Sequence, residues 1–368
     1  MIIKELTPAG LKEFINSEEF QQLNIIPITK HRALSHINNP RVDRDDVILF
    51  IAYQDNELAG YLGVLADTIY LNSEEHKVGW LSCIWTSEKV RGKGVAKQLL
   101  SAALNSWNNK ILATEFTPAA KSLYDQTAAF MDFTTLLGRR AYLRFNLHEL
   151  LPPKGFPTML SGLLKIGDAT LNIFNSLRLL GWGSSINIDH LNLEYIKVID
   201  DETKGFIEKR HKNELIRRGA EELSWINKYP WVLSSPEEDS DALRYHFSSS
   251  VKVFNNLNIK LMSNEGEVIA FMMIVVRGNN LKIPYCYFDE EHIGKIVQVI
   301  YHHMFELNLN MVTTYNSAIS NYFLSHRTPF IYNKQMSRSY LISKELGKNL
   351  TDKQQIHMQD GSGDCAFT

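Results

Sequence analysis

At residues 90–100 the sequence is Val90-Arg91-Gly92-Lys93-Gly94-Val95-Ala96-Lys97-Gln98-Leu99-Leu100. This stretch follows a strand-like run, Trp80–Trp85, and begins a segment with helical periodicity. The two glycines allow a tight turn that exposes successive backbone N–H groups. Those groups lie at a helix N-terminus, where the helix dipole favours an anion, and Arg91 and Lys93 add positive charge. The stretch therefore predicts a cradle for a pyrophosphate.

The spacing within this loop narrows the class of ligand. A Walker loop, G-x-x-x-x-G-K-[ST], is absent, and a Rossmann fingerprint is excluded because Lys97 stands three residues after Gly94. The pattern Arg91-x-x-Gly94-x-Ala96 instead resembles the acyl-CoA loop of the GNAT N-acetyltransferase superfamily.

The length and composition of the chain indicate how many domains it has and which classes of partner it can bind. The 368 residues predict two domains, and a hydrophobic content of 44% with 22% charged residues is typical of a globular protein. The net charge of −2 argues against a nucleic-acid partner, which needs a strongly basic surface. Cys83, Cys286 and Cys365 form neither a disulfide framework nor a CxxC zinc pattern, so we expect no metal and a cytoplasmic location.

We expect neither a signal peptide nor a membrane span in this sequence. Lys4 and Glu5 place charges where a signal peptide needs apolar residues. The longest apolar stretch, residues 158–182, contains Lys165, Asp168 and Arg178, which disfavours a membrane span.

The order of predicted elements strengthens the resemblance. We expect strands at residues 2–6, 47–53, 57–66, 76–86, 111–116 and 133–146, and helices at residues 7–20 and 29–37, after the glycine loop and from Pro118. This order is similar to that of the GNAT fold over residues 1–146. A second local match is Ala120-Lys121-Ser122-Leu123-Tyr124, although Thr117 stands where the family often has Asn.

The rest of the chain is predicted to contain a second, degenerate copy of the same fold. A boundary at Leu151–Gly155 separates a domain at 1–150 from a helical linker at 151–190, a second domain at 191–346 and a loosely docked tail at 347–368. In the second copy the residues Arg91, Gly94, Ala96 and Tyr124 are replaced by Gly294, Val297, Val299 and Phe323. We therefore predict an α/β fold with a mixed sheet, in which two GNAT-like acyltransferase folds stand in tandem.

The resemblance implies where an acyl-CoA cosubstrate would bind. The pyrophosphate would contact Arg91, Gly92, Lys93, Gly94, Val95 and Ala96, and the thioester would align with the backbone of Ile84, Trp85 and Thr86. Tyr124 would give a proton to the departing thiolate. The alternative for Tyr124 is a tyrosine that only packs in the core.

The general base and the acceptor site are less well defined by the sequence. Glu115, Glu75 and His76 are candidate bases, and Cys83 is expected to be a small core residue. In the acceptor region, the candidate side chains that recognise a carboxylate or phosphate are His31, Arg32 and Arg41.

Together these observations predict an acyltransferase that moves an acetyl or other acyl group from acyl-CoA to the amine of a small molecule by direct transfer. Two alternatives remain open. One is a Fem-type aminoacyltransferase that uses aminoacyl-tRNA, and the other is a non-enzymatic module that binds CoA. The sequence leaves the acceptor, the acyl chain and the oligomeric state undetermined.

Overall fold

A computed structural model describes residues 1–72, 74–150, 158–183, 186, 188–235, 240–348, 350 and 356–367. The chain forms two compact units. The first comprises Met1–Leu136, Val198–Phe254 and Arg338–Thr368, and the second comprises Leu137–Lys197 and Asn255–Ser337. The boundary predicted at residues 151–155 lies outside the described residues.

The first unit begins with the predicted alternation of strands and helices. Its elements are β1 (Ile2–Leu6), α1 (Pro8–Phe14), α2 (Glu18–Gln22), α3 (Lys30–Ile37), β2 (Leu49–Gln54), β3 (Glu57–Leu71), β4 (Glu74–Thr86), α4 (Val95–Ser106), β5 (Ile111–Thr114) and α5 (Pro118–Thr127). The helix predicted over residues 7–20 is two helices, because the Ser17 side chain accepts a hydrogen bond from the Phe20 amide and caps α2.

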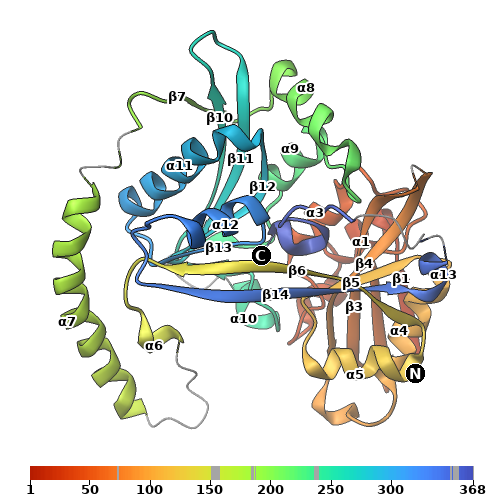
Figure 1. The fold of residues 1–368 in the computed structure, drawn as a ribbon. Helices are drawn as coiled ribbons and strands as arrows, with labels where there is room; N and C mark the ends of the chain where they lie inside the picture. Colours follow the sequence, from red (N-terminus) through yellow and green to blue (C-terminus); the bar gives the residue numbers. More distant parts are fainter. Residues whose placement is uncertain are drawn as a thin grey trace. The chain divides into compact units, whose positions relative to one another are not determined.

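The strands of this unit lie in the order β1-β2-β3-β4-β5-β14, where β14 is Tyr332–Ser343. Helix α4 packs across β2, β3 and β4 and also contacts α5 (Figure 1). Its buried face carries Val95, Leu99 and Ala103, as the helical periodicity predicts. This face holds the N-terminus of α4 at the end of β4.

The second unit repeats part of this element order. Its elements are α6 (Leu147–Leu150), α7 (Thr158–Gly183), β7 (Asn192–Tyr195), β10 (Phe254–Met262), β11 (Val268–Arg277), β12 (Asn280–Phe288), α11 (Ile293–Glu306), β13 (Met311–Thr314) and α12 (Ser317–Ser325). The run β11-β12-α11-β13-α12 matches β3-β4-α4-β5-α5 in the first unit. Its strand order is β6-β13-β12-β11-β10-β7, where β6 is Phe130–Tyr142.

The glycine loop of the first unit has no counterpart in the second. A short 3₁₀ helix, Glu290–His292, leads directly into α11, whereas residues 91–94 separate the corresponding segment Glu88–Val90 from α4. The predicted counterparts Val297 and Val299 lie inside α11 and are buried. The second unit therefore differs by the absence of the whole loop and not only by branched side chains within it.

The two long strands at the ends of the repeats explain why the units differ from the predicted domain ranges. Within the first unit, Tyr340, Leu341 and Ile342 of β14 pair with β5. Within the second unit, the end of β6 pairs with β13 from Met311↔Tyr142 to Thr314↔Arg139. The residues of β6 are thus divided between the two units, and so are those of β14. A single domain boundary in the sequence cannot describe such a division.

Two other segments also lie outside their predicted domains. Residues 198–254, with α8 (Asp201–Arg210), α9 (Ala220–Lys228) and α10 (Ser240–Arg244), belong to the first unit, and α7 belongs to the second rather than to a separate linker. The tail predicted to be loosely docked is largely buried at residues 360–367.

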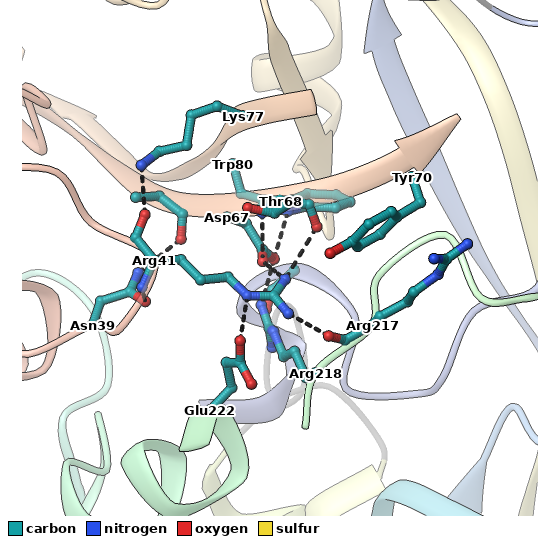
Figure 2. A network of polar contacts seen from close by, with 12 residues as sticks. Asn39, Arg41, Asp67, Thr68, Tyr70, Lys77, Trp80, Arg217, Arg218 and Glu222 are labelled. Atoms are coloured by element: carbon teal, nitrogen blue, oxygen red, sulfur yellow. Dashed lines mark hydrogen bonds and ion pairs between the residues drawn. The ribbon is translucent and has the colours of Figure 1, made fainter. Parts of the chain in front are cut away.

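A buried carboxylate holds these distant segments of the first unit together (Figure 2). Asp67, on β3, accepts hydrogen bonds from Arg41 at 2.6 Å, from Arg218 at 2.7 Å and from the Trp80 indole at 3.2 Å. Arg41 also pairs with Glu222 at 2.7 Å. Although burial alone would raise the pKa of Asp67, the Arg218 and Arg41 guanidiniums hold this pKa below its usual range.

Replacing this carboxylate should destabilise the fold strongly. We expect Asp67→Asn to lower the free energy of unfolding by about 3–5 kcal/mol, because two buried guanidiniums lose their counter-charge. Denaturant unfolding measures the change. The matched control is Asp45→Asn, since Asp45 is 85% exposed and pairs with Arg44 at 3.2 Å; it should cost less than about 1 kcal/mol. Equal losses for the two variants would contradict this account.

Candidate functional site

The first turn of α4 follows the glycine loop, in which the amides of Arg91 and Lys93 donate to the carbonyl oxygens of Glu88 at 3.2 Å and Val90 at 3.1 Å. Gly92 and Gly94 have φ angles of +81° and +78°, a region that side chains rarely adopt, and open space surrounds the position of a Cβ at both residues. Gly94 is the N-cap, and no side chain bonds the first turn of the helix there. The N–H groups of that turn are thus available to an anion.

Both cations of the loop lie close to this turn. Arg91 is 77% exposed and makes only a 3.2 Å surface pair with Glu88. Such exposed pairs contribute little to stability, so the guanidinium can exchange Glu88 for another anion at small cost. Lys93 lies in the same exposed turn.

Strand β4 separates from β5 just before this loop. The parallel pairing of β4 with β5 consists of Gly79↔Ile111 and Trp80↔Leu112, while β4 continues to Thr86 along its other neighbour, β3. Burial changes at the same point, because residues 78–82 are buried and residues 83–86 are partly exposed. The predicted positions Ile84, Trp85 and Thr86 therefore lie on an open strand edge that leads into the loop.

Cys83 forms a bulge at the start of this open edge. Its φ is +56°, and the register of β3 with β4 shifts between Tyr61 and Gly63. A left-handed non-glycine residue costs about 1–2 kcal/mol, which the surrounding packing must offset. The Cys83 sulfur accepts a hydrogen bond from Arg32 at 2.8 Å, so Cys83 is not the simple core residue that the sequence predicted.

A chain of hydrogen bonds runs from Arg32 to the C-terminal segment. Arg32 donates to the Ser82 hydroxyl at 2.6 Å, and this hydroxyl donates to the carboxylate of Asp364 at 2.8 Å. Arg32 also stacks on Trp231, 3.7 Å from the ring centre. The guanidinium is therefore fixed in place and partly balances the charge of Asp364.

Asp364 is a carboxylate that sequence reasoning missed. Burial raises its pKa, as does the nearby carboxylate of Glu115, whereas the Ser82 hydroxyl and Arg32 lower it; the net direction is upward. The residue keeps some exposure to solvent. A carboxylate with a raised pKa accepts a proton more readily near neutral pH, as a general base must.

Buried backbone contacts place Asp364 at this point. Arg218 donates to the carbonyl oxygens of Gly361 at 3.0 Å and Gly363 at 2.8 Å. The Phe367 ring stacks on Trp231 with centroids 4.5 Å apart and meets Trp225 edge-on at 5.0 Å. The only local sequence signal for this docking is the aromatic residue near the end of a polar tail, which alone does not identify its partners.

Tyr124, the predicted proton donor, lies on α5 and is 4% exposed. Its ring contacts Phe116 and Phe130 with centroids 6.0 and 5.3 Å away. Burial raises its pKa, and the Asp364 carboxylate adds to the increase. Tyr124 is therefore a neutral O–H group whose ring packs in the core.

The structure separates the three candidate bases. Glu75 and His76 lie at the start of β4, at the far end from its open edge, and pair with Tyr70 and Ile69 of β3. Glu115 follows β5 and forms an ion pair with Arg338 at 2.9 Å. Glu115 is thus near the open edge but is engaged with a cation.

The candidate acceptor residues have different surroundings. His31 hydrogen-bonds to the Trp231 carbonyl oxygen at 2.9 Å, and Arg32 belongs to the chain that ends at Asp364. Arg41 is bound on all sides by Asp67, Glu222, the Thr68 carbonyl and the Arg217 carbonyl (Figure 2). Its surroundings favour a structural role rather than recognition of an acceptor.

The residues that the structure describes contain neither a group of metal ligands nor a helix that could span a membrane. No set of His, Cys, Asp or Glu side chains within these ranges gathers closely enough to hold a metal ion. None of the described helices has both the length and the hydropathy that a membrane span needs.

Comparison with known proteins bears on the loop and on the fold. The model of the acetyltransferase (GNAT) family matches residues 13–128, which include the loop and Tyr124. No curated protein matches this sequence.

Solved structures resemble nearly the whole chain. A probable N-acyltransferase from Enterococcus faecalis has a TM-score of 0.54 at 11% identity and covers 94% of this chain and 73% of its own. A GCN5-related N-acetyltransferase from Anabaena variabilis scores 0.51 at 10%, covering 92% and 72%. The N-myristoyltransferase of Saccharomyces cerevisiae with bound myristoyl-CoA scores 0.52 at 10%, covering 93% and 78%. At such identities the likeness concerns the fold. Residues 13–128 therefore match the acetyltransferase (GNAT) family model, within a longer mixed α/β fold that resembles the solved structures of N-acyltransferases.

Proposed function

We propose that this chain transfers an acyl group from acyl-CoA to the amine of a small molecule. The observation that carries the proposal is the open edge of β4, where partly exposed residues 83–86 lead through the 3₁₀ helix Glu88–Val90 and the glycine loop to the first turn of α4, which no side chain caps. An acyl-CoA molecule needs both features, because its pyrophosphate requires N–H donors and its pantetheine arm requires a strand edge. The alternative donor, aminoacyl-tRNA, lacks support from the near-neutral net charge of −2.

The acceptor would be an amine because Asp364 supplies a negative charge and a proton acceptor at the same edge. In the proposed direct transfer, the Asp364 carboxylate takes a proton from the ammonium group, and the free amine attacks the thioester carbonyl. The carbon–sulfur bond then breaks, the Tyr124 hydroxyl gives a proton to the departing thiolate, and the second proton that the nitrogen loses on forming the amide restores the Tyr124 hydroxyl. Backbone N–H groups of residues 84–86 would stabilise the charge on the carbonyl oxygen.

The second unit would support the first without binding an acyl-CoA of its own. It has the strand and helix order of the first unit but lacks the glycine loop, since its 3₁₀ helix Glu290–His292 adjoins α11. We propose that the two units arose as tandem GNAT-like folds and that only the first kept the site. The cytoplasmic location remains a prediction from the three cysteines, all within the described residues, which form no disulfide with one another.

The loop predicts a specific loss of cosubstrate binding. We expect Gly94→Val to weaken acetyl-CoA binding about tenfold or more, because a branched side chain would fill the space in which a phosphate approaches the amides. Isothermal titration and the rise in Tm on adding acetyl-CoA both measure this.

Gly266→Val is the matched control for backbone strain. Gly266 lies in the turn between β10 and β11, with a φ of +87° and open space around its Cβ position. This variant should bind acetyl-CoA as the wild type does. Unchanged binding in Gly94→Val would exclude the proposed cradle.

Asp364→Asn tests the general base. Asparagine still accepts the Ser82 hydrogen bond but takes no proton, so we expect kcat/KM to fall about 100-fold, as is typical for a lost general base. In the wild type, activity should fall as the pH drops through the pKa of Asp364, which lies above its ordinary value. That acidic limb should disappear in the variant, while acetyl-CoA affinity and Tm remain. If Glu115→Gln removes the limb instead, Glu115 is the base.

Tyr124→Phe separates proton donation from packing. We expect kcat to fall about 10- to 100-fold with unchanged acetyl-CoA affinity, because the ring stays and only the hydroxyl is lost. Tyr301→Phe is the control, since Tyr301 is also buried, on α11 of the second unit, against Phe323 and Phe330. Equal turnover of Tyr124→Phe and the wild type would restrict Tyr124 to packing.

A further inference from the structure

Helix α7 of the second unit exposes an apolar face along most of its length. Leu163, Ile166, Ile173, Phe174, Leu177 and Leu180 form this face, which we name the outer face of α7, and these side chains are between 61% and 72% exposed. Exposed apolar residues are common singly, but a continuous stripe of this size indicates a binding surface.

The opposite face fixes the orientation of the helix. Asp168 accepts hydrogen bonds from the amides of Leu147 and His148 at 2.9 and 3.0 Å. Asn172 bonds both backbone groups of Phe145, and Asn175 donates to the Leu143 carbonyl at 2.9 Å. The polar side of α7 therefore faces residues 143–148 of its own unit, and the helix cannot rotate to bury its apolar side without breaking these bonds.

The spacing of the outer face matches a coiled-coil seam. Residues 163, 166, 170, 173, 177 and 180 follow the alternating three- and four-residue steps of a heptad repeat, with Thr170 as the one polar position. Asp168 and Asn175 occupy the heptad position opposite the seam, in agreement with their inward hydrogen bonds. Apolar residues that repeat every 3.5 residues on average form a seam that faces a second helix along its whole length.

The residues beside the seam favour an identical partner. The flanking heptad positions hold Gly167, Ala169, Ser176 and Gly181, together with Phe174 of the outer face. Small uncharged residues allow two helices to approach closely, and two copies meet without repulsion between like charges. A helix that lies on a lipid surface is usually rich in Lys and Arg, whereas the described part of α7 has only Lys165 and Arg178, and Arg178 bonds inward to Asn175 and the Pro329 carbonyl.

We propose that the outer face of α7 pairs with the same face of α7 in a second copy of this chain. The paired helices would bury roughly 1,000 Å² in total, which is near the lower limit for a specific interface. An interface at this lower limit is typical of a weak, transient association. This proposal stands apart from the proposed acyl transfer, because no residue of the outer face belongs to the first unit.

Sedimentation velocity over a range of concentrations tests the pairing on the full-length chain. The wild type should pass from monomer to dimer as its concentration rises. The double variant Ile173→Glu/Leu177→Glu should raise the dissociation constant by about 100-fold or more, because it places charges in an apolar seam. Leu324→Glu is the control, since Leu324 is a 54% exposed apolar residue on α12 of the same unit. An unchanged Tm in both variants excludes misfolding.

Three results would overturn the proposal. The first is a wild-type chain that remains a monomer at its highest soluble concentration. The second is a dimer that the double variant leaves intact. The third is a monomer that cosediments with vesicles of phosphatidylcholine and phosphatidylglycerol and loses this binding in the double variant, because lipid would then be the occupant of the outer face.

Discussion

The ion pair between Asp67 and two arginines is the constraint on which the site depends. Asp67 and Arg218 are each 1% exposed, so the carboxylate and the guanidinium have lost nearly all contact with water. Charges in such surroundings require partners, and Arg218 finds the remainder in the carbonyl oxygens of Gly361 and Gly363. The Arg218 side chain thus neutralises the charge of Asp67 on β3 and also holds the C-terminal segment in place. Because Asp364 follows directly, the ion pair also determines where the candidate base lies.

Two arginines hold the segment of the candidate base, Asp364, in different ways. Arg218 donates to the main-chain oxygens of Gly361 and Gly363, whereas Arg32 reaches Asp364 through the Ser82 hydroxyl. A direct pair with an arginine would lower the pKa of Asp364 and weaken it as a proton acceptor. With a hydroxyl between the charges, burial prevails and the pKa rises. The carboxylate can be held firmly and remain basic.

The sequence predicts the local parts of this site because their causes are local. The glycines, the helix periodicity after Gly94 and the strand before it lie within about twenty residues, and the structure confirms each element. The reciprocal placement of β6 and β14 depends on strand pairing between segments some 200 residues apart in the sequence, which periodicity does not encode. The same holds for Asp364. Nothing in Gly361-Ser362-Gly363-Asp364 specifies a partner, and Arg218 resembles any surface arginine until the fold surrounds it. Arg41, by contrast, was a reasonable acceptor candidate whose partners only the structure shows.

The two units share one order of strands and helices but differ at the start of the first helix of that order, α4 in the first unit and α11 in the second. In the first unit, four residues separate the 3₁₀ helix from α4, and both loop glycines have positive φ, which leaves the N-terminus of α4 without a side-chain cap as a candidate anion site. In the second, the corresponding helix begins at once, and its buried valines add to an apolar core that includes Ile296, Val297 and Ile300. The polar inward face and apolar outward face of α7 are the reverse of an ordinary surface helix, and an exposed apolar stripe of this kind is typical of a surface that binds a partner.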